Sequence, residues 1–262
     1  MRRIVTIISI LMPALALMAG DAGSLTAQIE QLALVHGARA VTDVPGPPSD
    51  PAALRVWSEA QQVSGPRLMV SLEDRRVWHM NGNRVLYTAP VAIGKSVILE
   101  WEGREWNFAT PRGRRAVLGK EKNPVWVPPD WHYVEVAMAQ GWQLEAVTRG
   151  KPFPLSDGSR VTVRGRSIGR SLPDGSFIAV PPGEEAVFEG TLFMPPIGSD
   201  NRRIPGELGR FKIDLGDAYY FHGTPYEQSI GTASTHGCLR LVDADIEHLY
   251  QTVAVGTPVF IY

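Results

Sequence analysis

The sequence of 262 residues contains a single cysteine, Cys238. An intramolecular disulfide is therefore impossible, and Cys238 is either buried and inert, paired with another chain, or kept free for reactivity. A structural zinc site is disfavoured for the same reason, because such sites usually have four ligands, often with two or more cysteines. A strong excess of charge is also lacking, since the formal net charge is −1. No overall field draws nucleic acid to the protein, and we expect no nucleic acid partner.

A long apolar segment is lacking as well. The apolar run from Ile4 to Ala19 falls short of the ~20 residues of a membrane-spanning helix. It follows a basic start and precedes small residues such as Ala22 and Ala27, which is the order of a secretory signal. We therefore expect residues 1–27 to be a signal peptide and the protein to be exported to the periplasm or cell wall, with no stable membrane span after cleavage. An uncleaved N-terminal anchor is the alternative.

Residues 28–65 are expected to form an N-terminal helical and linker segment. Proline, glycine and serine are frequent between Val41 and Ala52, which is typical of a linker. Asp50 followed by Pro51 predicts the N-cap and first position of a helix that continues to about Gln62.

From Pro66 onward the pattern is that of a mainly β protein, with short strand-like runs separated by proline and glycine. Asn81-Gly82 between two such runs predicts a β-hairpin with a type I′ turn. The expected strands are 68–72, 77–80, 84–87, 161–163, 177–180, 191–194, 211–215, 219–221 and 259–262. Two helices interrupt them, one from Trp131 to Gln140 capped by Asp130 and stopped by Gly141, the other over 244–252 capped by Asp243.

The residues that can carry chemistry lie near the C-terminus, in the runs His222-Gly223-Thr224 and Ser234-Thr235-His236-Gly237-Cys238-Leu239-Arg240. If the second run is extended, the side chains of Ser234, His236, Cys238 and Arg240 share one face. An imidazole beside a thiol can accept its proton, stabilise the thiolate and later return the proton to a leaving amine.

Two neighbours of the cysteine add to this chemistry. Arg240 either favours the thiolate and binds a substrate carboxylate, or braces a loop through backbone carbonyls. Gly237 leaves room for a substrate carbonyl to approach the backbone N–H donors of an oxyanion hole. His236 and Cys238 are also half of a possible zinc site, and His222 is a possible third ligand, but no carboxylate motif completes the set. We therefore predict no metal site.

The two runs resemble the signature of the L,D-transpeptidases with the YkuD-type catalytic domain. That signature is His-Gly, then Ser/Thr-His-Gly-Cys, a hydrophobic residue, and Arg or Asn. Four upstream segments also resemble the family: Leu68 to Gly94 as its opening hairpin and Gly-Lys turn, Thr110-Pro111-Arg112-Gly113, Asn123-Pro124-Val125-Trp126, and Ile204-Pro205-Gly206-Glu207-Leu208-Gly209. The resemblance covers about Pro66 to Tyr262.

The resemblance implies a YkuD-like β-sandwich with a few peripheral helices over residues 66–262. It implies that Cys238 is the nucleophile and that His236 is its base, oriented by a backbone carbonyl near Ser234, with Gly237 part of the catalytic run. The residues expected to bind substrate are His222, Gly223, Thr235 and Arg240.

The implied reaction is acyl transfer on peptidoglycan stem peptides. The thiolate attacks the carbonyl of the third residue, a diamino acid, and releases the terminal D-alanine. An amine of a second stem, or of a wall-attached protein, then resolves the thioester. No cofactor is needed, because the acyl-enzyme conserves the bond energy. The resemblance also implies that carbapenem-type β-lactams acylate Cys238.

The sequence departs from the family pattern over about 131–194, which is longer than usual. This inserted segment, with hairpins expected at Asp157-Gly158 and Asp174-Gly175, is either a lid that selects substrate or an inert elaboration. Three other functions stay open: a hydrolase on the same scaffold, acting as an L,D-carboxypeptidase or as an amidase that releases wall-attached protein; a non-catalytic wall-binding protein; and a zinc-binding protein.

Overall fold

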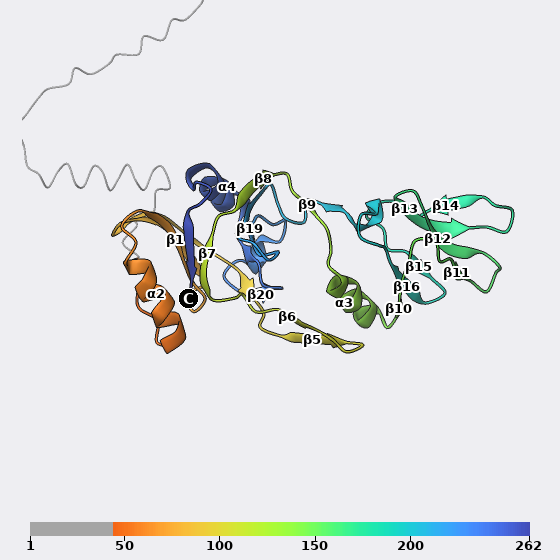
Figure 1. Cartoon of the computed structure of the whole chain (residues 1–262), viewed down its shortest axis with the longest axis horizontal. Coiled ribbons are helices and arrows are strands. Elements are labelled where there is room, and N and C mark those ends of the chain that lie inside the picture. The colour runs from red at the N-terminus through yellow and green to blue at the C-terminus, as the bar shows by residue number, and fades with distance from the viewer. Residues whose placement is uncertain (1–43) are drawn as a thin grey trace, which may run out of the picture. The chain divides into compact units, whose positions relative to one another are not determined.

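The computed structural model describes residues 44–262, which form a mainly β protein (Figure 1). This part of the chain contains twenty-two strands and three α-helices, which confirms the expected fold class. The expected signal peptide, and the part of the segment 28–65 that precedes residue 44, lie outside the described residues.

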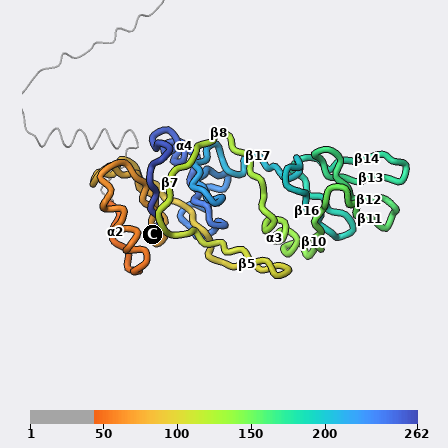
Figure 2. The backbone as a smooth tube through the Cα atoms, in the orientation of Figure 1, coloured from red at the N-terminus to blue at the C-terminus, as the bar shows by residue number. Residues whose placement is uncertain are grey.

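The first sheet joins the beginning of the strand region to the end of the chain. Its strand order is β3-β2-β1-β22-β7. The strands are β1 (Pro66–Ser71), β2 (Arg76–Asn81), β3 (Arg84–Pro90), β7 (Gly113–Ala116) and β22 (Pro258–Ile261). β22 runs parallel to β1, with Leu68 opposite Val259, and antiparallel to β7. The C-terminal strand therefore lies between β1 and β7, as the trace of the backbone shows (Figure 2).

The hairpin β2–β3 is present as predicted, but its turn differs from the expected one. Asn81 pairs with Arg84, so the two turn residues are Gly82 and Asn83 rather than Asn81 and Gly82. Gly82 has a φ of +54°, and Asn83 has no positive φ. A type I′ turn needs positive φ at both central positions, whereas a type II′ turn needs it only at the first, where glycine is preferred. The prediction of a type I′ turn was therefore wrong.

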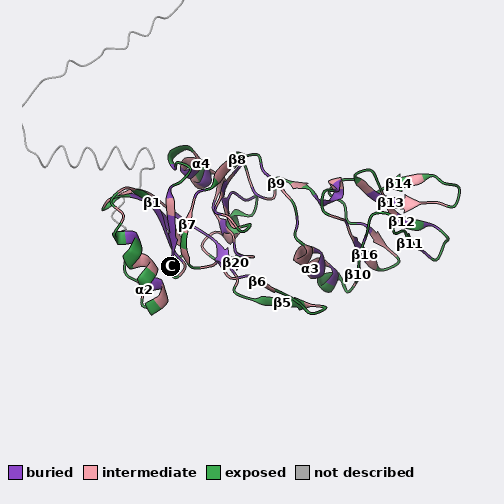
Figure 3. Cartoon of the chain, viewed as in Figure 1, coloured by how far each residue is buried: buried purple, intermediate pink, exposed green. Residues whose placement is uncertain are grey.

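A second sheet packs against the first and completes a sandwich. Its order is β21-β19-β18-β8. The strands are β8 (Gly119–Lys122), β18 (Phe211–Asp214), β19 (Tyr220–His222) and β21 (Leu239–Arg240). One core cluster unites Leu68 and Val70 of the first sheet with Ile213, Phe221 and Leu239 of the second, and the buried residues of this core are purple in Figure 3. Burial of each such side chain stabilises the fold by roughly 1.5–3 kcal/mol.

Helix α2 (Pro51–Gln61) begins as the sequence predicts. The Asp50 side chain accepts a hydrogen bond from the Ala53 backbone N–H at 3.0 Å, and Pro51 is the first helical residue. Ala53 and Ala60 belong to a separate core cluster with Met69 and Phe260. α2 therefore covers the face of the first sheet that does not pack on the second.

Helices α3 (Asp130–Gln140) and α4 (Asp243–Thr252) do not have the predicted caps. Pro129 and Val242 occupy the N-cap positions, and neither provides a side-chain cap. Asp130 and Asp243 are instead the first helical residues, where a carboxylate is still favoured by the helix dipole. Their carboxylates bond elsewhere: Asp130 pairs with two arginines, and Asp243 accepts the Arg210 N–H. The predicted stop at Gly141 is confirmed by its left-handed φ of +69°.

The inserted segment builds two further sheets. One is β10 (Gln143–Ala146), β16 (Thr191–Met194) and β15 (Val187–Phe188); the other is β11 (Phe153–Pro154), β12 (Arg160–Arg164), β13 (Ser167–Ser171) and β14 (Phe177–Ala179). The hairpins expected at Asp157-Gly158 and Asp174-Gly175 are both present, with φ of +80° and +86° at the glycines. Val161, Ile168 and Phe193 lie in a core cluster that contains only residues of this segment. The segment thus has a hydrophobic core of its own.

Short paired strands connect these parts. They are β4 (Ile93–Gly94) with β20 (Ala233–Thr235), β5 (Ile98–Trp101) with β6 (Arg104–Asn107), and β9 (Val125–Trp126) with β17 (Ile204–Pro205). Two short 3-10 helices, η1 (Asp200–Arg202) and η2 (Glu227–Ser229), lie in the connections. β9 and β17 pair the two chain segments that lead into and out of the insertion. Within residues 44–262, none of the helices is long and apolar enough to cross a membrane.

Candidate active site

Cys238 lies in a bend between two strands that belong to different sheets. β20 pairs with β4, whereas β21 pairs with β19, and Gly237 between them has a φ of +118°. The run from Ser234 to Arg240 is therefore not one extended strand, and the predicted single row of side chains was wrong. Cys238 is half-buried, and its Sγ lies 3.7 Å from the carbonyl oxygen of Ala218.

Two buried threonines hold this bend in place. The Thr235 hydroxyl donates to the Cys238 carbonyl at 2.7 Å and accepts the Gly237 N–H at 3.2 Å. The Thr110 hydroxyl donates to the Gly237 carbonyl at 2.9 Å and accepts the Gly94 N–H at 2.8 Å. Thr235, expected to bind substrate, is thus turned into the interior and supports the cysteine loop. Thr110 comes from the Thr-Pro-x-Gly run, whose individual role the sequence did not reveal.

Gly237 is required by its surroundings as well as by its backbone angle. A Cβ at this position would lie 2.7 Å from the Tyr219 ring and 3.2 Å from the Ala109 carbonyl oxygen. A φ of +118° is also a conformation that residues with a side chain rarely adopt. Any other residue would displace the backbone that carries Cys238.

His222 lies on the strand next to the cysteine. β19 runs parallel to β21, with Phe221 opposite Leu239 and His222 opposite Arg240. Phe221 and Leu239 are buried in the core. Because side chains alternate along a strand, His222 and Arg240 point to the other face. Cys238 directly precedes β21, and its thiol contacts the backbone of Ala218 and Tyr220, at the start of the strand that carries His222.

The protonation of His222 is fixed by its backbone partner. Nδ1 lies 2.6 Å from the Gly223 carbonyl oxygen. A carbonyl can only accept, so Nδ1 carries the proton and Nε2 carries the lone pair. The side chain is only 4% exposed, and this burial lowers the pKa of His222 to about 4. His222 is therefore a neutral imidazole with a free acceptor nitrogen at neutral pH.

The thiol of Cys238 is also neutral at rest. Burial raises the pKa of the Cys238 thiol to about 11, against the opposing effects of the Tyr220 backbone N–H and of the Arg240 charge. A thiol in this state becomes nucleophilic only when a base removes its proton. The site therefore needs a neutral base, and His222 on the neighbouring strand is a neutral imidazole.

Arg240 neither braces a backbone carbonyl nor pairs with a carboxylate in this structure. Its Nη1 donates to the Ser229 hydroxyl at 3.0 Å, and its buried Nε forms no hydrogen bond within residues 44–262. Burial lowers the pKa of Arg240. Ser234 is exposed, and its hydroxyl accepts a hydrogen bond from Thr232 rather than facing Cys238.

His236 is held by residues that the sequence did not predict as part of the site. Its Nε2 lies 2.7 Å from Glu135 Oε2 and 3.1 Å from Lys95 Nζ, and Glu135 Oε1 pairs with Lys95 at 2.7 Å. The Trp131 ring stacks on the imidazole at 4.0 Å and 16°, and Phe108 meets it edge-on at 4.5 Å. Trp131 and Glu135 both belong to α3, so the inserted segment contributes to the surroundings of the cysteine motif.

The charges in this cluster follow from its contacts. Burial acts to raise the pKa of Glu135, but its bonds to Lys95 and His236 outweigh this and hold it below the usual value. Burial lowers the pKa of His236 despite the opposing charge of Glu135. Glu135 is therefore ionised and His236 neutral at neutral pH. One feature of the sequence indicated Lys95, because it follows Gly94 in the expected Gly-Lys turn. Nothing in the sequence distinguished Glu135 from other carboxylates on helices.

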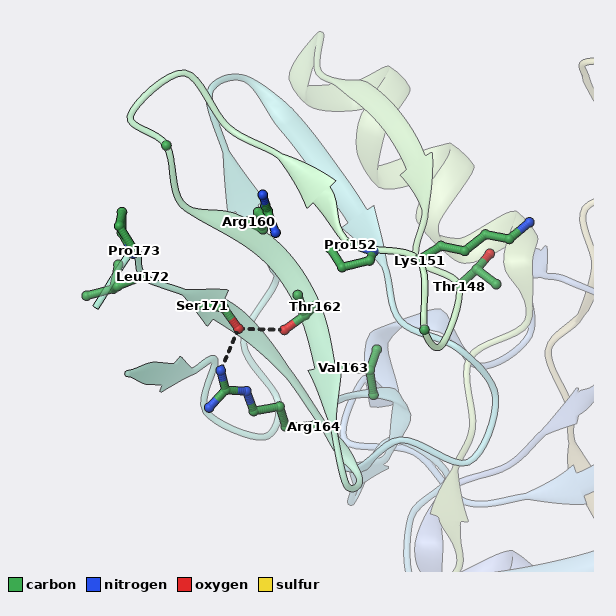
Figure 4. A pocket seen from close by; sticks show the side chains of 12 residues that line it. Thr148, Lys151, Pro152, Arg160, Thr162, Val163, Arg164, Ser171, Leu172 and Pro173 are labelled. Atoms are coloured by element: carbon green, nitrogen blue, oxygen red, sulfur yellow. Dashed lines mark hydrogen bonds between the residues drawn. The ribbon is translucent and has the colours of Figure 1, made fainter. Parts of the chain in front are cut away.

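Two cavities lie in the described part of the chain, and neither is lined by Cys238. One of about 290 Å³ is lined by Gly209, Thr224 and Asp243, among others, next to Gly223. Gly223 has no room for a side chain, because a Cβ there would lie 2.0 Å from Asp243 Oδ1. The other cavity, of about 630 Å³, lies in the inserted segment over β12 and β13 (Figure 4). Lys151, Arg160 and Arg164 line it without any acidic residue.

A metal centre has no ligand set in the described part of the chain. No three histidine, cysteine, aspartate or glutamate side chains within residues 44–262 gather in a way that could hold an ion. The zinc-binding alternative therefore receives no support from the structure.

The chain is similar in sequence to curated L,D-transpeptidases. Among curated proteins the chain is similar to "Probable L,D-transpeptidase ErfK/SrfK" of Salmonella typhimurium, 26% identical over 194 residues, which cover 73% of this chain and 42% of that protein. It is also similar to "Probable L,D-transpeptidase YbiS" of Escherichia coli K12, 39% identical over 64 residues, which cover 24% of this chain and 19% of that protein. The matches thus span less than half the length of these two relatives.

Solved structures of L,D-transpeptidases align less closely. The enzyme from Xylanimonas cellulosilytica aligns with a TM-score of 0.38 at 14% identity, covering 88% of this chain and 68% of that chain. The enzyme from Mycobacterium smegmatis aligns with a TM-score of 0.38 at 18% identity, covering 75% of this chain and 58% of that chain.

The decisive match is to a family model described as "YkuD: L,D-transpeptidase catalytic domain", which covers residues 65–261. It includes both β-sheets of the sandwich, the inserted segment and the cysteine bend. Since this is well over half of the chain, the protein belongs to the L,D-transpeptidase catalytic-domain family.

Proposed function

We propose that the protein is a peptidoglycan L,D-transpeptidase in which Cys238 forms the acyl-enzyme. The observation that carries the proposal is that the Cys238 thiol contacts the backbone at the start of β19, the strand that ends in His222, while His222 Nδ1 is bonded to the Gly223 carbonyl. His222 thus offers Nε2 as a neutral acceptor on the strand next to the cysteine bend, and activation of a neutral thiol requires such an acceptor.

The sequence favoured His236 as the base, and the geometry favours His222 instead. The Nε2 of His236 is engaged by Glu135 and Lys95, and its ring is stacked under Trp131. A backbone carbonyl does orient an imidazole in this site, but it is that of Gly223 and the imidazole is that of His222. The expected carbonyl near Ser234 makes no such bond to His236 among the described residues.

The first half of the reaction follows from these positions. His222 Nε2 takes the Cys238 proton as Sγ attacks the carbonyl of the third, diamino-acid residue of a tetrapeptide stem. The tetrahedral intermediate collapses with cleavage of the C–N bond, and the departing D-alanine nitrogen takes the proton back from His222. The product is a thioester on Cys238 and a neutral imidazole, so no nucleotide is consumed. Arg240 is half-buried, its buried Nε forms no hydrogen bond within residues 44–262, and it supplies positive charge from β21, directly after the cysteine bend.

In the second half, an amine attacks the thioester and forms the new amide. The acceptor is an amine of a second stem peptide or of a wall-attached protein. Peptidoglycan lies outside the cytoplasmic membrane, so the proposal requires an exported protein, in agreement with the signal peptide expected at residues 1–27.

Mass spectrometry tests the proposal directly. Purified protein is mixed with muropeptides that carry tetrapeptide stems, beside a Cys238→Ala variant. We expect loss of D-alanine together with formation of dimers in the wild type only. Shortened monomers without dimers would replace the proposal by the hydrolase. Unchanged substrate in both samples would contradict acyl transfer from tetrapeptide stems.

A β-lactam of the carbapenem type provides a second test of the nucleophile. We expect it to acylate Cys238, so that the intact mass rises by the mass of the drug and the modified tryptic peptide contains Cys238. An unmodified Cys238 after prolonged exposure of folded protein would count against its role as nucleophile.

A further inference from the structure

The second half of the proposed reaction requires a proton transfer that His222 does not provide, namely the deprotonation of the acceptor amine. An acceptor amine is an ammonium ion at neutral pH, because alkylamines have a pKa of about 10. It must lose a proton before its nitrogen can attack the thioester. In the proposed mechanism His222 serves the thiol and takes part in the exchange between thiol and thiolate. A separate base near the cysteine bend would let the two proton transfers occur independently.

The cluster of His236, Glu135 and Lys95 has the properties of such a base. Glu135 Oε2 and Lys95 Nζ both approach the same ring nitrogen, Nε2, at 2.7 Å and 3.1 Å. A carboxylate only accepts and an ammonium only donates, so one nitrogen cannot bond to both at once. The Glu135 carboxylate resolves this conflict, because its other oxygen already binds Lys95 at 2.7 Å. Each tautomer allows two hydrogen bonds in the cluster, but a lone pair on Nε2 would face the Glu135 carboxylate oxygen at 2.7 Å without a proton between them. The favoured state is therefore Nε2–H donating to Glu135.

This tautomer places the lone pair of His236 on Nδ1. Nδ1 forms no hydrogen bond with any of the residues 44–262, and the side chain is 28% exposed. A substrate can therefore reach it. The stacked Trp131 ring and the edge of Phe108 hold the plane of the imidazole, so the direction of the lone pair is fixed. A carboxylate behind an imidazole both orients the ring and stabilises its protonated form.

We propose that His236, oriented by Glu135 of the inserted segment, is the base that deprotonates the acceptor amine in the second half-reaction. The inference rests on the proposed function, because it needs a thioester on Cys238. Glu135 is a positioning residue in this scheme, and His236 is the group that touches the acceptor. The inserted segment then contributes a positioning residue to the active site.

The step balances in atoms and charge. The acceptor ammonium gives one proton to His236 Nδ1 and becomes a neutral amine. Its nitrogen attacks the thioester carbonyl, the C–N bond forms, and the C–S bond breaks. The departing thiolate regains a proton, the second one lost by the nitrogen, through His222. The imidazolium of His236 then returns its proton to water.

The groups around His236 keep its pKa low enough for the imidazole to return to the neutral form at neutral pH. Glu135 and His132 face it from α3, Lys95 lies just after β4, and Arg240 lies on β21. Burial lowers the pKa of His236, as do Lys95 and Arg240, whereas Glu135 raises it. Loss of the Glu135 charge would therefore lower the pKa of His236 further and weaken it as a base.

Separate measurement of the two half-reactions tests the inference. The first turnover of D-alanine release reports acylation, and addition of an amine acceptor to the preformed acyl-enzyme reports transfer. The variants are His236→Gln and Glu135→Gln, and the matched control is Glu145→Gln, an exposed carboxylate of β10 in the same insertion. Failure of wild-type protein to release D-alanine would refute the proposed function itself, independently of His236.

We expect D-alanine release within about threefold of wild type in both test variants, with transfer slowed by about 10²-fold in His236→Gln, a size typical of general base catalysis. Glu135→Gln should show a smaller loss of the same kind, and the acyl-enzyme should accumulate in intact mass spectra. Raising the pH towards the pKa of the amine should restore transfer, which a purely structural defect would not allow. Equal losses in both half-reactions, or no loss of transfer in either variant, would overturn the inference.

Discussion

At the scale of single residues, the two histidines of the site differ in what holds them. His222 is anchored by a backbone carbonyl inside the sandwich, whereas His236 is anchored by charged side chains, one of them from the insertion. A backbone anchor cannot titrate or be removed by mutation. The proton of His222 Nδ1 is therefore fixed by the fold, while the state of His236 depends on Glu135 and Lys95.

The burial of His222 makes the free energy of unfolding depend on pH. Its pKa is about 4 in the folded protein and near 6.5 when the chain is unfolded. Below pH 6.5 the unfolded chain binds a proton that the folded protein does not, so stability is complete above pH 6.5 and falls as the pH drops towards 4. The effect amounts to at most about 3 kcal/mol. We expect His222→Gln to lose this share of the pH dependence in urea unfolding between pH 7 and pH 4. An unchanged pH dependence in the variant would contradict a buried neutral His222.

Replacement of Thr110 should weaken the loop that carries Cys238. Its hydroxyl both donates to Gly237 and accepts from Gly94, and the residue is buried. Thr110→Val keeps the shape and leaves two backbone groups without a partner, which costs about 1–3 kcal/mol each at most. We expect a lower urea midpoint and slower acylation of Cys238. Thr252→Val, which removes an exposed hydroxyl on α4, is the control and should change neither.

At the scale of elements, two variants of Asp50 can separate the N-cap of α2 from the ion pair that the same side chain forms. Asp50 caps the helix through Ala53 and also pairs with Arg112 at 2.9 Å. Asp50→Ala removes both interactions, whereas Asp50→Asn keeps a capping oxygen and loses only the charge. We expect Asp50→Ala to lower the free energy of unfolding by about 1 kcal/mol, the usual worth of an N-cap. Asp50→Asn should lose only a few tenths, because exposed ion pairs contribute little. Equal losses would mean that the ion pair, not the cap, stabilises α2.

The same scale shows what sequence patterns can predict. Turn residues and apolar alternation located the hairpins and the α2 cap, because these signals act between residues close in the chain. Asp130 and Asp243 were predicted to be N-caps, but each helix begins one residue earlier and they are its first residues. The N-cap position depends on the backbone angles at Pro129 and Val242. The bend at Gly237 was missed because it arises from pairing of β20 and β21 with strands far away in the sequence. Glu135 was missed for the same reason: its partner lies 101 residues further along the chain.

At the scale of the whole described chain, the central question is how the inserted segment is tied to the sandwich. Arg202 lies where the segment returns, is only 3% exposed and connects its two ends. Its guanidinium donates to the Pro128 carbonyl at 2.7 Å and the Pro195 carbonyl at 3.0 Å, and it pairs with Asp130 at the first turn of α3. Arg202 therefore helps to hold the start of α3, the helix that places Trp131 and Glu135 against His236.

Replacement of this cation should loosen α3 without removing any residue that faces Cys238. Arg202→Met fills a similar volume but leaves two carbonyls without their donor and Asp130 with Arg104 as its remaining partner. Breaking a buried pair from one side costs at most about 3–5 kcal/mol. We expect faster amide hydrogen exchange in α3, weaker quenching of Trp131 by its stacked imidazole, and transfer slowed more than acylation. Arg203→Met, a change at the neighbouring exposed arginine, is the matched control and should leave all three unchanged. If Arg202→Met slows both half-reactions equally while α3 stays protected from exchange, the insertion does not act through the position of His236.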